Sequence, residues 1–308
     1  MTTSQKNNPQ HRSPRAFCHA ALALLAAMWL TLAPSKVSAQ EADTAACCVL
    51  RPVASVFTAD FGHASLLDTY LTPIRYSGWN TRLAYERLQA MKFSPEHWVS
   101  QLEFGTDYSH VTNPAGNHTM HALMVDASWH MLHKWRNTFS VPALQLMAGA
   151  GTGLHGGAIY NANNANNVVS VKIRWSVDAS LAAVWNTRLG STPLTLRYQA
   201  TLPVAGVFYS PEYDESYFEI YVGHHSSLTH FGWWGNRFDM TNFASADFHL
   251  GGTVLRVGFR NRIETSWIKN LNTQISTNSF VIGVGGDIFS IGRRKPSAGH
   301  TKIISSIY

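Results

Sequence analysis

The chain has 308 residues, of which 45% are hydrophobic, 12% aromatic and only 14% charged. A soluble domain usually carries about a quarter charged residues, so this chain is poor in charge and rich in aromatic side chains. Disorder is excluded, because disordered chains contain few aromatic residues and have a large net charge. The formal net charge of +6 does not indicate nucleic-acid binding, because eight basic residues lie within residues 1–39 and 293–308 and leave no basic face between them.

Residues 1–39 have the pattern of a secretory signal peptide. Basic residues, the last of them Arg15, precede an apolar run that ends near Ala33, and Val37-Ser38-Ala39 offers a small-x-small cleavage site. An N-terminal transmembrane anchor is the alternative interpretation. The cleavage site stands at the right distance from the apolar run, so we expect an exported protein with a cleaved signal peptide.

Most of the remaining chain alternates between apolar and polar residues. Every odd position from 169 to 185 is apolar, whereas the even positions from 170 to 180 read Ser, Lys, Arg, Ser, Asp and Ser. The segments 101–108, 194–202 and 255–260 repeat this alternation. A period of two indicates β-strands with one apolar and one polar face. Membrane-spanning helices are excluded, because no stretch of about 18 uninterrupted apolar residues follows the leader.

The length of these segments favours a barrel of the outer membrane over a soluble sandwich. Strands of soluble sandwiches commonly have about five or six residues, whereas a tilted strand needs about 9–11 to cross a membrane. The polar faces carry charges in mid-strand, while Trp98, Trp185 and Trp267 lie near the ends of apolar faces. Apolar residues outside, charges inside and aromatic girdles are typical of outer-membrane barrels. A soluble sandwich would place one of these faces in the wrong environment.

The number of strands follows from the pattern and from parity. Single-chain bacterial barrels have an even number of strands. The turns at 189–192 and 250–253 should both face the periplasm, and an odd number of predicted strands lies between them. One strand is therefore missing between about 200 and 240, and we expect an all-β, antiparallel, up-and-down transmembrane barrel of twelve strands. The eleven strands we recognise span 51–62, 79–93, 96–112, 118–135, 138–158, 167–188, 192–207, 215–224, 238–251, 253–268 and 274–292.

This interpretation divides the chain into four parts. They are a signal peptide (1–39), an N-terminal extension (40–50), the barrel (51–292) and a basic C-terminal tail (293–308). If the alternation holds, a set of charged side chains projects into the lumen. Mixed charges there can pair and plug a narrow barrel or line a small polar channel, and we favour a filled barrel. The predicted lumen-facing residues are Lys172, Arg174, Arg197, Glu219, Arg256 and Arg260, together with Glu103 and Asp107.

Several motifs recur in a fixed order along the chain. They are Asp68-Thr69-Tyr70-Leu71-Thr72-Pro73, Tyr76-Ser77-Gly78, Asn113-Pro114-Ala115-Gly116-Asn117, Tyr160-Asn161-Ala162-Asn163-Asn164, the run from Leu196 to Ile220, and Ser279-Phe280-Val281-Ile282-Gly283. Together they resemble an uncharacterised family of outer-membrane-type barrel proteins from gut bacteria of the Bacteroides kind, filed as a domain of unknown function. The resemblance spans roughly residues 53–292. It implies a β-rich envelope protein and brings no catalytic residues with it.

One arrangement near the predicted missing strand fits catalysis. Outer-membrane lipid hydrolases, the phospholipase A and lipid A deacylase families, place a His and a Ser two residues apart on a strand, as His224 and Ser226 are here. Residues i and i+2 share a strand face, so the imidazole can take the hydroxyl proton, and Asn236 could orient that ring. His225 and Ser227 offer an overlapping register, and the family resembled has no such pair. We therefore favour a surface loop and keep a lipid hydrolase as the alternative.

No metal or cofactor site is predicted. His224, His225 and His230 have no Asp or Glu nearby in the sequence, and their spacing matches no zinc site. The glycines at 149–157 and 283–286 lack the strand-to-helix context of a phosphate loop. We expect a monomeric outer-membrane barrel in contact with lipid, with a structural, binding or narrow-transport role, no cofactor and no nucleic-acid partner. The sequence does not identify a ligand.

Overall fold

The computed structural model describes residues 48–136, 141, 143–164, 167–212, 215–223, 227–288 and 301–307. The predicted signal peptide lies outside these residues. Among the described residues, none of the helices is long and apolar enough to cross a membrane. The elements are β1 (Cys48–Leu50), β2 (Val53–Asp68), β3 (Thr72–Ala90), β4 (Trp98–Thr112), β5 (Thr119–Arg136), β6 (Leu144–Tyr160), β7 (Val169–Leu189), β8 (Thr192–Tyr209), α2 (Tyr217–Tyr221), β9 (Thr229–Trp233), β10 (Arg237–Leu250), β11 (Thr253–Ile268), β12 (Leu271–Ile288) and β13 (Thr301–Ile303).

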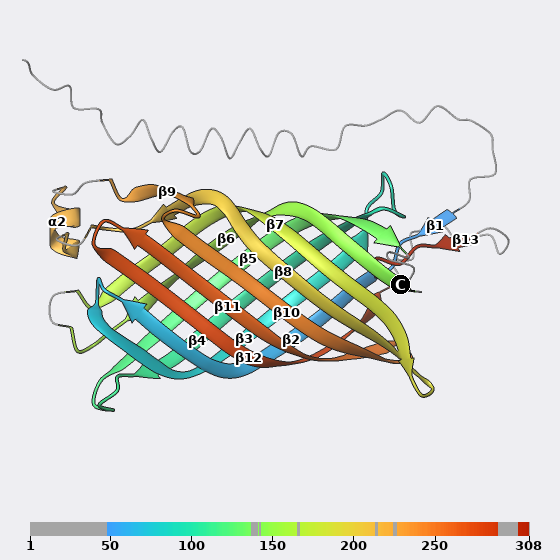
Figure 1. Cartoon of the computed structure of the whole chain (residues 1–308), viewed down its shortest axis with the longest axis horizontal. Helices are drawn as coiled ribbons and strands as arrows, with labels where there is room; N and C mark the ends of the chain where they lie inside the picture. The colour runs from blue at the N-terminus through green and yellow to red at the C-terminus, as the bar shows by residue number, and fades with distance from the viewer. Residues whose placement is uncertain are drawn as a thin grey trace, which may run out of the picture. The chain divides into compact units, whose positions relative to one another are not determined.

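Within the described part of the chain, ten strands close into an antiparallel barrel (Figure 1). Sequence neighbours pair from β2 to β8 and from β10 to β12, and the ring closes because β12 pairs with β2 and β10 pairs with β8. The short strand β9 stands outside the ring and pairs with the last residues of β8. The predicted all-β antiparallel barrel is therefore confirmed.

The predicted count of twelve strands is wrong, because the segment 215–224 is not a strand. It contains the helix α2, whose first turn is held by a capping box: Ser216 Oγ accepts from the Glu219 amide at 3.3 Å, and Glu219 Oε2 accepts from the Ser216 amide at 2.6 Å. A Ser-x-x-Glu pattern is a helix-start signal that competes with the apolar pattern around it. Without this strand, β8 and β10 are the two described barrel strands between the turns at 189–192 and 250–253, since β9 stands outside the ring, and parity is satisfied by ten strands.

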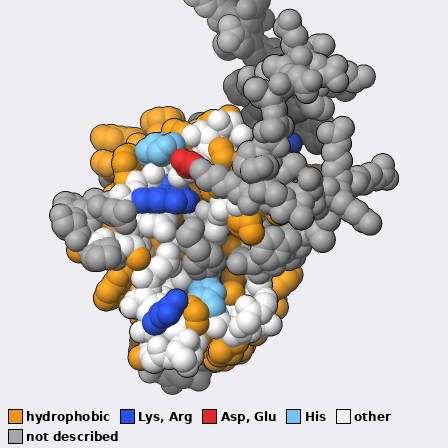
Figure 2. Space-filling view, turned by 90° about the vertical axis from the view of Figure 1, so that its right-hand side faces the viewer, with side chains coloured by type: hydrophobic (Ala, Val, Ile, Leu, Met, Phe, Trp, Pro, Cys, Tyr) orange, Lys and Arg blue, Asp and Glu red, His pale blue; other side chains and the backbone are white. Residues whose placement is uncertain are grey.

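The hairpin turns define two ends of the barrel. We call the end with the turns at 69–71, 113–118 and 269–270 the loop end, and α2 lies on this side (Figure 1). The opposite end, which we call the terminus end, holds β1, β13 and the turns at 190–191 and 251–252. Figure 2 looks onto the terminus end and shows apolar side chains around its periphery, with few charged side chains in view.

The outer surface of the barrel carries a band of exposed apolar side chains. Aromatic residues flank the band, with Trp79 and Trp267 towards the loop end and Trp135 and Trp185 towards the terminus end. Soluble monomers rarely expose a continuous apolar surface of this extent. The band includes Phe57, Phe61, Leu83, Phe104, Leu123, Val125, Leu154, Ile173, Leu181, Val257, Phe259, Phe280, Ile282 and Val284.

The interior is stacked in three layers, of which the outer two are apolar. We call them the loop-end layer and the terminus-end layer, and the charged side chains between them the ionic layer. The loop-end layer contains Ala64, Leu66, Tyr70, Leu71, Tyr76, Val111, Met120, Ala122, Met124, Ile159 and Leu271. The terminus-end layer contains Ala54, Leu88, Val99, Leu132, Met147, Ala182, Val184 and Ile307.

The last described residues of the chain pack into the terminus-end layer. Strand β13 pairs in parallel with β1, and the following Ile304 and Ile307 are buried. The buried Lys134 donates from Nζ to the carbonyl oxygens of Ser305 at 3.1 Å and Ser306 at 3.3 Å. Residues 304–307 therefore close the terminus end, and a buried ammonium group is matched to peptide oxygens there.

Candidate functional site: the ionic layer

Arg82 on β3 is the centre of one half of the ionic layer. Its guanidinium group contacts Asp107 at 2.5 Å and Glu103 at 3.1 Å, both on β4, and reaches across that strand to Asp126 on β5 at 2.5 Å. Between the two β4 carboxylates stands Gly105, where an added Cβ would lie 2.1 Å from Arg82 Nη2. The absence of a side chain at residue 105 therefore allows one guanidinium group to span three strands.

Glu86 on β3 is the centre of the other half. Its carboxylate accepts hydrogen bonds from Arg197 on β8 at 2.7 and 3.0 Å and from Arg256 on β11 at 2.5 Å. Gln101 on β4 donates to the same carboxylate at 2.8 Å. Arg256 also forms a bidentate pair with Asp247 on β10, with both distances at 2.7 Å. Side chains from five strands therefore meet at the buried carboxylates of Glu86 and Asp247. The guanidinium group of Arg256 donates hydrogen bonds to both carboxylates.

Two further arginines of β11 cross the lumen. Arg262 contacts Asp107 at 2.5 Å, and Arg260 contacts Asp60 on β2 at 3.3 Å and Glu103 at 3.2 Å. These contacts join β11 to strands β2 and β4 through the interior. The ionic layer thus ties the wall together across its width, in addition to the backbone pairing around its circumference.

The sequence-predicted lumen residues divide into two groups. Arg197, Arg256 and Arg260 are buried in the ionic layer as just described. Lys172 pairs with Asp68 at 2.8 Å, and Arg174 pairs with Asp239.

Glu219 does not lie on a strand or in the lumen. It belongs to the capping box of α2, because the segment that carries it forms a helix. Of the two acidic residues predicted on the β4 face, Asp107 is buried and Glu103 is half-buried, and both take part in the ionic layer.

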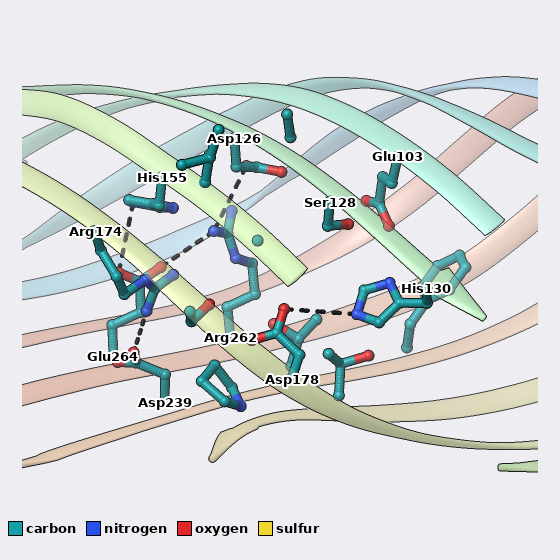
Figure 3. Close-up of a pocket in the computed structure, with 18 of the residues that line it drawn as sticks. Glu103, Asp126, Ser128, His130, His155, Arg174, Asp178, Asp239, Arg262 and Glu264 are labelled. Carbon is teal, nitrogen blue, oxygen red and sulfur yellow. Dashed lines mark hydrogen bonds and ion pairs between the residues drawn. The ribbon is translucent and has the colours of Figure 1, made fainter. Parts of the chain in front are cut away.

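A polar cavity of about 100 Å³ lies within the ionic layer (Figure 3). His130 Nε2 faces Asp178 Oδ2 at 3.6 Å on one side, and His155 Nε2 faces Glu264 Oε2 at 3.6 Å on the other. Liquid water occupies about 30 Å³ per molecule, so the cavity is suited to a few waters or one small polar group. Drug-sized ligands need pockets of about 300–1,000 Å³.

Several buried polar atoms around this cavity have no hydrogen-bond partner among the described residues. They include the Nδ1 atoms of His130 and His155, and Oδ1 of Asp178 and Asp239. Buried polar atoms normally have partners, so these atoms are available to hydrogen-bond to water or to another small polar group in the cavity. In the described part of the chain, no group of three or more His, Cys, Asp or Glu residues is arranged to hold a metal ion.

The predicted His-Ser-Asn arrangement lies partly outside the described residues, which do not include His224, His225 and Ser226. Asn236 occupies the turn between β9 and β10. Its Oδ1 accepts from the Trp233 amide at 2.9 Å, and its Nδ2 donates to the Phe231 carbonyl at 2.8 Å. Both ends of the amide are therefore used by the turn itself. Ser227 donates to the carbonyl of Thr229 at 3.0 Å.

Most of the partners in the ionic layer were not predicted. The alternation contained a usable signal, because Arg260, Arg262 and Glu264 occupy successive inward positions of β11 and Arg82 and Glu86 share the inward face of β3. The alternation does not identify the partner of each charge. Arg256 and Glu86 are 170 residues apart in the chain, and only closure of the barrel brings them together.

The sequence matches the family described as "Protein of unknown function (DUF3316)" over residues 21–295. The chain belongs to this family. A search of the curated proteins finds no match.

Among solved structures, three similar chains are domains of autotransporters. The β domain of the Bordetella autotransporter BrkA has 10% identity and a TM-score of 0.40, and covers 77% of this chain and 100% of its own. The AIDA-I transport unit from Escherichia coli has 7% identity and a TM-score of 0.38, and the match covers 85% of this chain and 97% of that unit. The NalP translocator domain from Neisseria meningitidis has 12% identity and a TM-score of 0.33, and the match covers 88% of this chain and 98% of that domain.

Proposed function

We propose that this protein is a filled, ten-stranded barrel of the outer membrane of a Gram-negative bacterium. It is exported with a cleaved signal peptide and acts as a monomeric membrane scaffold with a binding role, rather than as a wide pore. The observation that carries the proposal is the three-layered interior, in which two apolar layers enclose an ionic layer.

Membrane insertion is supported by the outer surface. The exposed apolar band and its flanking tryptophans match the hydrophobic belt and aromatic girdles of transmembrane barrels. The backbone is compatible with lipid, because a closed barrel leaves few N–H and C=O groups without partners. The charged side chains of the ionic layer point into the lumen, away from the lipid. There they pair with charges of opposite sign.

The filled lumen argues against a diffusion pore. Arg256 and Lys134 are each 1% exposed, so the middle and the terminus end are both occupied by long side chains. A barrel of about eight strands has an interior that side chains just fill, and ten strands widen it by about a quarter. The paired arginines and carboxylates of the ionic layer occupy this extra width. The buried side chains of Ile304 and Ile307 also occupy space at the terminus end.

The test is reconstitution of the mature chain, residues 40–308, into planar phospholipid bilayers. We expect a heat-modifiable, folded barrel that gives no stable conductance steps, measured beside a sixteen-stranded porin as the open control. Reproducible steps with the unmodified protein would overturn the filled-barrel proposal. Mass spectrometry of the exported protein should find Gln40 as its first residue, and a retained leader would contradict the signal-peptide part.

A further inference from the structure

The wall of the barrel is interrupted between β8 and β10. Pairing between these strands runs from Leu194 opposite Phe248 to Thr201 opposite Thr241 and stops there. It resumes with Ala205 opposite Trp233, now on β9. Residues 202–204 of β8 therefore face the longer segment 234–240 without strand pairing, and of that segment residues 237–240 pair with β11 on the other side. We call this interruption the seam.

A gap in backbone pairing is costly in a barrel wall that meets lipid. An unpaired N–H or C=O group in hydrocarbon costs several kcal/mol, so such a gap needs another partner. Pro203 lowers this cost on β8 because it has no N–H group. Its carbonyl accepts a hydrogen bond from Trp234 Nε1 at 2.9 Å, so an exposed side chain covers part of the seam from outside.

Apolar side chains surround the outer mouth of the seam. Trp175 and Val177 of β7, Val204 and Val207 of β8, and Trp233 of β9 are each 39–58% exposed. The seam therefore opens at a part of the outer surface that suits a hydrocarbon chain.

The inner mouth of the seam leads towards the polar cavity. A pocket of about 20 Å³ at the seam and the cavity of about 100 Å³ share Arg174, Ser176, Pro203 and Asp239 in their linings. Arg237 donates to Asp239 at 2.6 Å beside this pocket. Asp239 Oδ1 and Arg174 Nε, both buried, have no hydrogen-bond partner within the part of the chain that the structure describes.

We propose that the seam binds a single-chain amphiphile with a small, uncharged, hydroxyl-bearing head group of the glycerol class. Its chain lies on the apolar mouth, and one hydroxyl of its head group enters the seam pocket of about 20 Å³ between β8 and β10. The proposal rests on the membrane placement argued above and adds a ligand to it.

The charges at the seam select this kind of head group. Basic and acidic side chains line the cavity side by side and pair with one another, so an added charge of either sign would meet a repelling neighbour. The unpartnered atoms include both an acceptor (Asp239 Oδ1) and a donor (Arg174 Nε). A hydroxyl group is both donor and acceptor, so it satisfies both without adding charge.

The experiment uses tryptophan quenching in phosphatidylcholine vesicles that contain the full mature chain. The probes are a brominated monoacylglycerol and the fatty acid with the same brominated chain, each at low mole fraction. We expect the monoacylglycerol to quench more strongly, and Trp233→Phe to reduce the excess quenching, with the remainder coming from Trp175 and Trp234 at the same mouth. The matched control is Trp135→Phe, which removes a tryptophan of similar exposure at the other end of the barrel. Ser176→Val, which loses one hydroxyl at the shared lining, should weaken the apparent affinity about fivefold.

The outcomes separate the two proposals. Vesicles made wholly of brominated phosphatidylcholine test insertion, and an absence of quenching there would overturn the membrane placement itself. Quenching in that arm, with equal responses to the two probes or no change in Trp233→Phe, would leave the membrane placement standing and overturn the amphiphile site. If Ser176→Val does not fold, the exposed Trp233→Phe still decides the question.

Discussion

The wall between β6 and β7 and the wall between β8 and β10 are held in different ways. The first is paired without a break from Leu144 opposite Trp185 to Tyr160 opposite Val169. The second loses its backbone pairing beyond Thr201. Inside this break, Asp239 of β10 contacts Arg174 of β7, so an ion pair joins the strands on either side of β8. Interior ion pairs can therefore hold strands together where the backbone hydrogen bonds stop.

The largest expected effect comes from breaking the ionic layer where the wall is intact. Replacing Glu86→Gln leaves Arg197 and Arg256 without the carboxylate that they share. Loss of one partner from a buried ionic cluster costs about 3–5 kcal/mol, so the free energy of unfolding should fall by that amount. Urea unfolding of the protein in micelles measures it. The neighbouring exposed Arg87→Gln is the control and should change stability by less than about 0.5 kcal/mol.

A second substitution addresses the seam. Asp239→Asn keeps the shape of the side chain and weakens the contacts with Arg174 and Arg237. Hydrogen bonds to a charged group contribute about 1.5–3 kcal/mol, and we expect a loss within that range. Hydrogen exchange should accelerate in 237–240 and leave β6 and β7 unchanged. Uniform acceleration around the barrel would contradict the view that this ion pair acts locally.

A third substitution tests the glycine that accommodates Arg82. In Gly105→Ala the new Cβ would overlap the guanidinium group, which three carboxylates hold in place. Overpacking of this kind costs about 1–3 kcal/mol. Gly156→Ala is the matched control, because a Cβ at that position meets no atom within 4 Å. Equal unfolding midpoints for the two variants would show that Arg82 moves freely.

The smallest expected effect is at the outer side of the seam. Trp234→Phe keeps an aromatic ring and removes the N–H group that donates to the Pro203 carbonyl. One neutral hydrogen bond contributes about 0.5–1.5 kcal/mol, so global stability should change little. Exchange of the amides near 202–204 should still rise. Protection there that matches the wild type would show that the side chain does not cover the seam.

The sequence by itself determined the strand faces and the character of the wall. A period of two assigns every second residue to one face whatever the neighbouring strand is, so Arg174, Arg197 and Arg256 could be assigned to the polar face of their strands. The same alternation indicated an apolar exterior and an all-β barrel.

The tertiary structure decided the strand count, the pairing of charges and the seam. Residues 217–221 are apolar enough for a strand, and the capping contacts of Ser216 and Glu219 select a helix instead. Which carboxylate meets Arg256 depends on how many strands close the ring, because closure sets the distance across the lumen. The seam arises from a mismatch in length between 202–204 and 234–240, and such a mismatch exists only once the residues that flank both segments are paired.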